Sequence, residues 1–223
     1  MLSAIILAAG RGARLETKTS KALVKINRKP LINYSLGIFN SHPEIDEIIT
    51  VVSRDNKKQI IAAVKKAYLK KVRVFVLGGA RRQDSVFNGL KQVSSQSDWV
   101  LIHDSARPFI DRESITKVIK EAKRTGAAIL GVPVKATIKK ARRRAVIQTM
   151  DRSCLWEIQT PQVFKKELLL EAYKKFSKND FTDDASLVEK LDKKVRIVTG
   201  RYENIKITTK VDLLFAQLIA KGS

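Results

Sequence analysis

The sequence is poor in the side chains that build disulfides, zinc centres and histidine-based catalytic sites. Among 223 residues it has one cysteine, Cys154, and two histidines, His42 and His103. A single cysteine cannot form an internal disulfide, and these three residues do not amount to a zinc-ligand cluster. A cysteine and histidine nucleophile pair is conceivable but is not favoured. Any catalysis is therefore expected to depend on other side chains, and we interpret His103 as a packed residue at a strand end.

Long apolar runs are also missing. No segment approaches the roughly 20 apolar residues that a membrane-spanning helix needs. The segment after Met1 shows no basic, apolar and small-residue succession of a secretory signal. Hydrophobic residues make up 44% and charged residues 30% of the chain, which is the balance of an ordinary globular protein. We expect a cytoplasmic protein with no membrane partner.

Acidic residues are scarce relative to basic ones. The chain has 22 aspartates and glutamates against 44 lysines and arginines, so its net charge is +22. Such a field attracts polyanions, but the basic residues are spread along the chain and are densest in 139–145 (KKARRRA). No aromatic residues interleave with that run. We favour a solvated basic surface or a polyanionic substrate, with nucleic acid as a non-specific partner at most.

Apolar and helix-period segments alternate along the chain. The continuous β-branched runs are typical of buried parallel strands and lie at 3–8, 47–53, 72–77, 99–104, 127–134 and 195–200. The helix-period segments are 30–42, 56–70, 84–94, 111–126, 165–177, 183–191 and 211–222. This order predicts one α/β domain over 1–223, built on a mostly parallel sheet with helices on it. Residues 135–152 are too polar for the core, and we expect them to form a protruding arm of two short strands.

The loop after the first strand, AAGRGAR, carries the clearest chemical signal. Gly10 and Gly12 offer unhindered backbone N–H groups, which can form an anion-binding nest. The loop lacks the Walker A pattern, and Leu15 stands where a dinucleotide fingerprint needs its third glycine. Arg14 and Lys21 lie on the same connection, where a triphosphate over the nest would need neutralising. We therefore predict a nucleoside triphosphate site at the carboxyl end of the first strand.

Six motifs in a fixed order turn this prediction into a resemblance that covers essentially the whole chain. They are LAAGRGAR (7–14), GGARRQDSV (78–86), HDSARP (103–108), TPQVF (160–164), TDDAS (182–186) and NIKIT (204–208). Together they resemble the 2-C-methyl-D-erythritol 4-phosphate cytidylyltransferase family. The resemblance implies a Rossmann-like, three-layer nucleotidyltransferase fold of the GT-A-like kind and a homodimer formed through the 135–152 arm. It also implies that CTP and a polyol phosphate are the substrates.

The resemblance also assigns a reaction. A substrate phosphate oxygen would attack the α-phosphorus of CTP in line, and pyrophosphate would leave. A phosphate is already ionised at neutral pH, so no general base is needed, and catalysis consists of positioning and cationic stabilisation. Mg²⁺ or a similar divalent cation is implied, since this metal binds through substrate phosphates with one or two carboxylates. Asp104 is the candidate metal ligand.

The resemblance assigns roles residue by residue. Arg14 and Lys21 are implied to stabilise the transition state. The residues implied to bind CTP are Ala8, Ala9, Gly10, Gly12, Gly79, Ser85 and Asp104. Those implied to position the acceptor are Arg107, Thr137, Arg152, Thr160 and Lys206. In this reading Arg82 either contributes to the nucleotide site or only holds its loop.

Three residues depart from the family pattern. Ser20 stands where a proline usually precedes the catalytic lysine, Ala22 replaces a glutamine, and Ala136 replaces an aspartate. The first change can loosen the loop that carries Lys21, and the third removes a carboxylate near the acceptor. Two alternatives stay open: a pentitol phosphate cytidylyltransferase of the same fold, and a non-catalytic nucleic-acid-binding protein.

Overall fold

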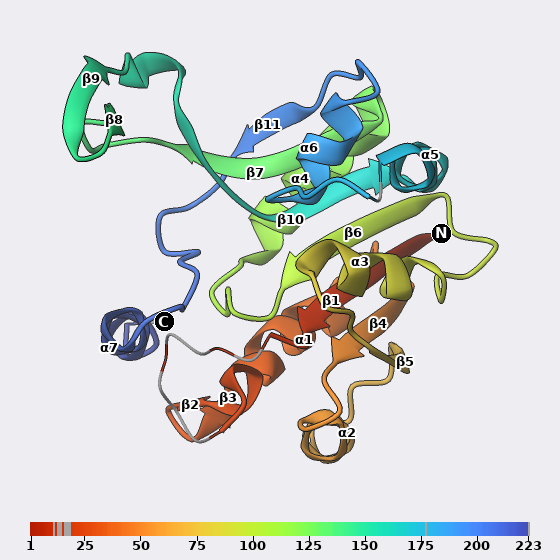
Figure 1. Ribbon diagram of the computed structural model, residues 1–223. Coiled ribbons are helices and arrows are strands. Elements are labelled where there is room, and N and C mark those ends of the chain that lie inside the picture. Colours follow the sequence, from red (N-terminus) through yellow and green to blue (C-terminus); the bar gives the residue numbers. More distant parts are fainter. Residues whose placement is uncertain (11, 13–14, 16–18, 177, 223) are drawn as a thin grey trace.

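The central feature of the computed structural model is a seven-stranded sheet with strand order β11-β7-β10-β6-β1-β4-β5 (Figure 1). The structure describes residues 1–10, 12, 15, 19–176 and 178–222. Arg14, a predicted catalytic residue, lies outside the described residues. No helix in the described part of the chain is long and apolar enough to cross a membrane.

Five predicted strands form the parallel frame of this sheet. They are β1 (Leu2–Ala8), β4 (Glu47–Val52), β5 (Val72–Leu77), β6 (Trp99–Asp104) and β7 (Ala127–Pro133). β1 pairs in parallel with β4 on one side and with β6 on the other. The strands that follow β1 are thus added first on one side of it (β4, β5) and then on the other (β6). The carboxyl ends of β1 and β6 therefore lie at the switch point where open α/β sheets bind ligands.

Strand β10 (Trp156–Lys165) is the main element that the strand pattern did not predict. It runs antiparallel between β6 and β7, and Gln162 pairs with Ile102 on one side and with Ile129 on the other. A bulge separates Ile158 from Gln162 in the β7 pairing, and the Thr160–Pro161 peptide bond within it is cis. The strand brings the TPQVF motif beside Asp104. The edge strand β11 (Arg196–Thr199) pairs in parallel with β7.

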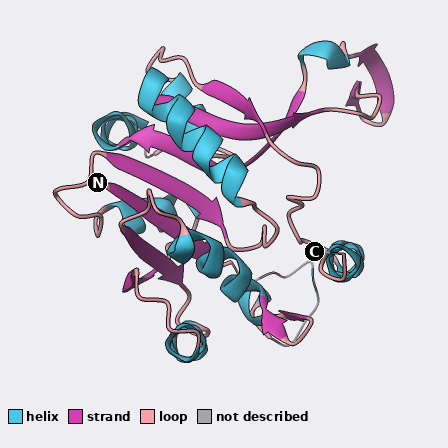
Figure 2. Ribbon diagram, turned by 180° about the vertical axis from the view of Figure 1, so that it is seen from behind, coloured by secondary structure: helices cyan, strands magenta, loops and turns pink. Residues whose placement is uncertain are grey.

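Helices cover both faces of the sheet. One core contains side chains of α1 (Leu31–Ser41), α2 (Lys57–Lys66) and α4 (Arg112–Thr125). The other contains side chains of α3 (Arg82–Leu90), α5 (Lys166–Phe176) and α6 (Asp184–Glu189). Neighbouring residues of β1 point into opposite cores, Ile6 into the first and Ile5 into the second. This is the predicted three-layer α/β arrangement, and Figure 2 shows it from behind.

Two appendages leave the sheet. The arm consists of β8 (Lys139–Arg142) and β9 (Ala145–Thr149), a two-stranded sheet, followed by the short helix η3 (Arg152–Cys154). Its turn residues Arg143 and Arg144 have φ of 48° and 68°, which is the backbone of a tight two-residue hairpin. At the lower left of Figure 1, α7 (Lys210–Ile219) contacts the small hairpin of β2 (Lys25–Ile26) and β3 (Lys29–Pro30).

Candidate active site

A cavity of about 640 Å³ opens at the carboxyl ends of β1 and β6. It is the place that the switch-point rule indicates. Its walls come from the end of β1, the short helix η2 (Lys21–Leu23), the start of α3 and the segment after β6. Predicted site residues on these walls are Ala8, Ala9, Gly10, Lys21, Gly79, Ser85, Asp104 and Lys206. Tertiary folding therefore brings together residues that are up to 198 positions apart (206 − 8).

Small residues on one wall of this cavity let neighbouring backbone segments approach one another closely. A Cβ atom on Gly78 would lie 2.5 Å from the Cβ of Ala9 and 2.8 Å from Oγ of Ser85. Gly79 donates its backbone N–H to Oγ of Ser85 (3.0 Å), and the Ser85 hydroxyl donates to the carbonyl of Arg81 (3.2 Å). The glycines thus allow the end of β5 to touch both β1 and the start of α3. The result is a slot bounded by backbone and small side chains.

The acidic side chain of Asp104 faces two cations. Its Oδ2 accepts a hydrogen bond from Nζ of Lys206 (2.6 Å), and its Oδ1 accepts from Nε of Arg82 (3.3 Å). Burial alone would raise the pKa of Asp104, but Arg82 and Lys206 hold it well below its ordinary range. Asp104 is therefore a carboxylate at neutral pH. Its two ion pairs hold Arg82 at the start of α3 and Lys206 near the end of the chain against the cavity wall.

Arg82 joins Asp104 to a second acid beneath the cavity. Its Nη1 donates to Oδ2 of Asp184 (2.7 Å), while the hydroxyl of Tyr173 donates to Oδ1 of the same carboxylate (2.7 Å). Burial opposes the charge of Arg82, yet Asp184 and Asp104 keep its pKa raised. Asp184 comes from the TDDAS motif, and its part in this network was not predicted. The network indicates that Arg82 holds α3 and α6 together at the site.

A second chain of hydrogen bonds fixes the end of β6. The backbone N–H of Asp104 donates to Oγ1 of Thr160 (3.0 Å), which lies 3.1 Å from Nδ1 of His103. Nε2 of His103 lies 3.0 Å from the carbonyl of Arg107, which can only accept. The proton is thus on Nε2, and Thr160 donates to Nδ1. His103 is a packed strand-end residue, as the sequence indicated, and burial lowers its pKa to about 4.

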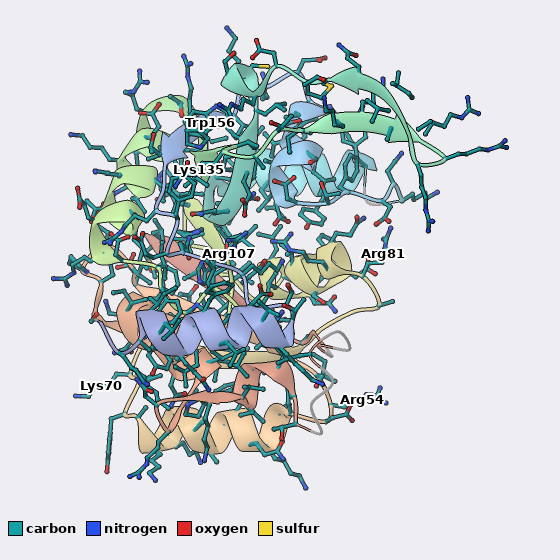
Figure 3. All side chains as sticks on the ribbon, turned by 90° about the vertical axis from the view of Figure 1, so that its left-hand side faces the viewer. Arg54, Lys70, Arg81, Arg107, Lys135 and Trp156 are labelled. Carbon is teal, nitrogen blue, oxygen red and sulfur yellow. The ribbon has the colours of Figure 1, made fainter. Side chains whose placement is uncertain are left out.

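Arg107 is buried, and its guanidinium bonds backbone carbonyls. Nη1 donates to Asn204 (2.7 Å) and Nη2 to Ile158 (3.2 Å), so the side chain ties β10 to the segment that carries Lys206. Within the described residues its Nε is buried without a hydrogen-bond partner. Arg107 is only 6% exposed, and Figure 3 labels it near the centre of the view.

A second cavity of about 430 Å³ adjoins the first. The two share Arg82, Asp104 and Lys206 as a common wall. Arg107 and Thr160, two of the residues predicted to position an acceptor, line the second cavity. The side chain of Asp104 thus separates the predicted nucleotide residues from this part of the predicted acceptor set.

Lys21 begins the helix η2 and lines the same cavity as Asp104. Gly12, with φ of +67°, lies against it, and a Cβ on Gly12 would come within 2.7 Å of the Cβ of Lys21. This glycine is therefore required for close approach as well as for its backbone angle. Among the described residues that line the cavity, Gly12 is not included. Its predicted contact with CTP stays a prediction.

Thr137 and Arg152 lie apart from both cavities. Thr137 is exposed at the base of the arm, and Arg152 in η3 donates to the carbonyl of Lys135 (2.7 Å). The Lys135 ammonium in turn lies 3.4 Å from the ring centre of Tyr202. These two predicted acceptor residues do not meet the others within one chain, which is the arrangement expected if they serve a neighbouring subunit.

The residues present fit a divalent cation that is held by one carboxylate together with substrate phosphates. In the described part of the chain, no three histidine, cysteine or acidic side chains gather into a metal cage. Among the described lining residues, Asp104 is the one that supplies an ionised carboxylate, and each of its oxygens retains a lone pair beyond its ion pair. This donor set suits Mg²⁺, which takes one or two carboxylates and completes its shell with water and substrate phosphates.

Comparison with known proteins gives consistent matches over the whole chain. The family model of IspD, 2-C-methyl-D-erythritol 4-phosphate cytidylyltransferase, matches residues 2–221. The protein of that name from Shouchella clausii is 47% identical over 221 residues, which cover 98% of this chain and 96% of the relative. The crystal structure of 4-diphosphocytidyl-2C-methyl-D-erythritol synthase from Anaerococcus prevotii superposes with a TM-score of 0.88 at 36% identity, covering 99% and 96% of the two chains. The Thermus thermophilus 2-C-methyl-D-erythritol 4-phosphate cytidylyltransferase superposes with a TM-score of 0.81 at 31% identity, covering 98% of each chain.

Proposed function

The chain belongs to the 2-C-methyl-D-erythritol 4-phosphate cytidylyltransferase family, and from this premise we propose that it transfers CMP from CTP to 2-C-methyl-D-erythritol 4-phosphate. The products are 4-diphosphocytidyl-2-C-methyl-D-erythritol and pyrophosphate. The relatives compared above carry the erythritol name, so the pentitol phosphate alternative is not favoured, and neither is a non-catalytic nucleic-acid-binding protein.

One observation supports the proposal most directly. Within one cavity the chain places a slot of small residues, the cationic Lys21 and the ion pair of Asp104 with Lys206. A pyrimidine base fits against Ala9 and the Gly78–Gly79 turn, where a larger purine would meet backbone and small side chains. The cationic residues lie where the phosphates of a nucleotide in that slot need compensation.

In the proposed reaction a phosphate oxygen of the acceptor attacks the α-phosphorus of CTP. The new bond joins that oxygen to phosphorus, the bond to the β-phosphate oxygen breaks, and pyrophosphate takes the electron pair. The charge that builds on the oxygens around phosphorus is met by Lys21 from one wall. Arg14 is assigned the same role from the resemblance, although it lies outside the described residues. Positioning and cationic stabilisation suffice because the nucleophile is ionised.

The acceptor is proposed to approach from the side of the second cavity. Arg107, Thr160 and Lys206 line it, and the buried Nε of Arg107 offers a donor not used within the described residues. Thr137 and Arg152 are proposed to complete this site from a neighbouring subunit. The exposed apolar side chains of Val146 (63%) and Ile147 (58%) on the arm support a homodimer in which they become covered.

A divalent cation, Mg²⁺ or a similar ion, is proposed to accompany CTP. Asp104 would hold it together with the CTP phosphates. When bound, the ion would neutralise phosphate charge and help pyrophosphate to leave. Asp104 itself orients Lys206 through the 2.6 Å ion pair, whatever the state of the metal site.

Residence in the cytoplasm stays a prediction from the sequence.

The test is release of pyrophosphate by the purified protein. We expect release from CTP only when the erythritol phosphate is added, with little from ATP, GTP or UTP, and none in excess chelator. Ribitol 5-phosphate, at the same concentration, tests the pentitol alternative. Equal turnover with ATP, or release that does not need an acceptor, would contradict the proposal. Nucleic-acid binding would instead fall by orders of magnitude between roughly 50 and 200 mM salt, whereas turnover at an enclosed site would fall far less.

A further inference from the structure

A buried side chain, Asn56, ties the turn that carries Lys21 to the end of β1. This residue precedes α2, is fully buried, and comes from a segment that carries none of the predicted site residues. One hydrogen of its amide nitrogen goes to the carbonyl of Ala8 (2.8 Å) and the other to Oγ of Ser20 (2.8 Å). Its Oδ1 accepts from the backbone N–H of Ser53 (2.9 Å). The carboxamide thus connects the end of β1, the end of β4 and the residue before Lys21.

The local geometry of Ser20 shows that its hydroxyl is used for this contact. Ser20 is the N-cap residue of η2, but its side chain makes no capping hydrogen bond to that helix. A serine at this position ordinarily accepts from the next turn of its own helix. Here the oxygen accepts from Asn56 instead, and η2 is three residues long. The turn therefore depends on contacts made outside itself for its orientation.

Two wall elements of the nucleotide cavity are joined through this contact. Ala8 and Lys21 both line the cavity, and Asn56 holds the carbonyl of one and the residue before the other. Leu23, at the end of η2, donates its N–H to the carbonyl of Ser20 (2.8 Å), so the position of Ser20 sets the whole turn. Ser20 has φ of −51°, an angle that a proline ring would also hold. A hydrogen bond therefore does here what a ring could do covalently.

We propose that Ser20 and Asn56 form a polar clip that positions Lys21 for the transition state. They are positioning residues, since neither lies on the cavity wall. The proposal deepens the proposed function and rests on it, because it assumes that Lys21 stabilises charge during transfer. Loss of the clip lets the ammonium group of Lys21 occupy other positions. This weakens the stabilisation of the charge that develops in the transition state more than it weakens the binding of ground-state CTP.

The decisive variants change one hydroxyl. Ser20→Ala removes the acceptor, and Ser20→Thr retains it. Ser53→Ala is the matched control, because it removes a hydroxyl that accepts from the backbone N–H of Asn56 (3.2 Å) without touching Ser20. We expect Ser20→Ala to lower kcat roughly tenfold with KM for CTP changed less than about twofold, since one positioning hydrogen bond is lost. Ser20→Thr and Ser53→Ala should keep kcat.

A double-mutant cycle tests that the two residues act as one unit. Asn56→Ala should lower kcat at least as much as Ser20→Ala, and the double variant should be no slower than Asn56→Ala alone. Multiplied effects in the double variant, an unchanged kcat in Ser20→Ala, or an equal loss in Ser53→Ala would each overturn the clip.

Hydrogen exchange provides a measurement that does not need activity. We expect backbone amides of 19–24 to exchange faster in Ser20→Ala than in the wild type or Ser20→Thr, while α4 is unchanged. Equal exchange in Ser20→Ala and wild type overturns the clip. A wild-type protein that fails to release pyrophosphate from CTP contradicts the proposed function instead, and the exchange result then still decides whether the clip holds the turn.

Discussion

Lowering the pH should destabilise this protein through His103. The imidazole is buried, its ring lies 4.8 Å from that of Phe39, and burial lowers its pKa from 6.5 to about 4, although the neighbouring Asp104 carboxylate opposes the shift. Between these two pKa values the unfolded chain binds a proton at this residue and the folded chain does not. The free energy of unfolding therefore falls as the pH falls from 6.5 towards 4.

The size of this effect follows from the two pKa values. Between pH 7 and pH 5, a group with pKa 6.5 in the unfolded chain and about 4 in the folded chain lowers the free energy of unfolding by about 2 kcal/mol. The loss in unfolding free energy grows further below pH 5 and levels off below about pH 4, where both the folded and the unfolded chain carry the proton. It reflects the burial of the imidazole, which disfavours the charged form.

The measurement is urea unfolding at pH 7, 6 and 5, for the wild type and for His103→Gln. The glutamine does not titrate but offers an amide in place of Nε2. All other titrating groups are common to both proteins and cancel in the difference between them. We expect the wild type to be the more stable at pH 7 and its advantage to shrink by about 2 kcal/mol at pH 5. A difference that is constant over this range would refute the assignment of a buried neutral histidine.

Other perturbations give separate expectations. Lys21→Ala should lower kcat on the order of 100-fold or more with little change in KM, and an unchanged kcat would show that Lys21 is not catalytic. When Lys21→Ala and Arg152→Ala proteins are unfolded and refolded together, about a quarter of all sites should recover if two subunits share each site; no recovery despite mixed dimers would place Arg152 in its own chain's site. Gly78→Ala should cost about 1–3 kcal/mol of unfolding free energy because its Cβ meets Ala9 at 2.5 Å, whereas Gly37→Ala, with open space at its Cβ, should not; urea titration distinguishes them.

The strand order around the site shows what the sequence could not reveal about the fold. The parallel strands were predictable because their continuous apolar runs report burial on both faces. β10 was not, since the polar residues Gln159, Thr160 and Gln162 interrupt its apolar pattern. Those side chains are buried because they bond to distant partners: Gln159 to Arg201, Gln162 to Asp183. A strand held by such long-range polar contacts leaves no local periodicity to detect.

The candidate site divides in the same way. The sequence by itself determined the nature of the loop after β1 and, through the six ordered motifs, the family. It also predicted Lys21, Asp104 and Lys206 as site residues, and all three line the cavity. These are matters of residue type and order along the chain. Only the tertiary structure decided that Asp104 pairs with Arg82 and Lys206, and that Asn56 holds Ser20. Such contacts join positions 22 to 102 residues apart, and their distances and burial arise only when sheet packing brings those segments together.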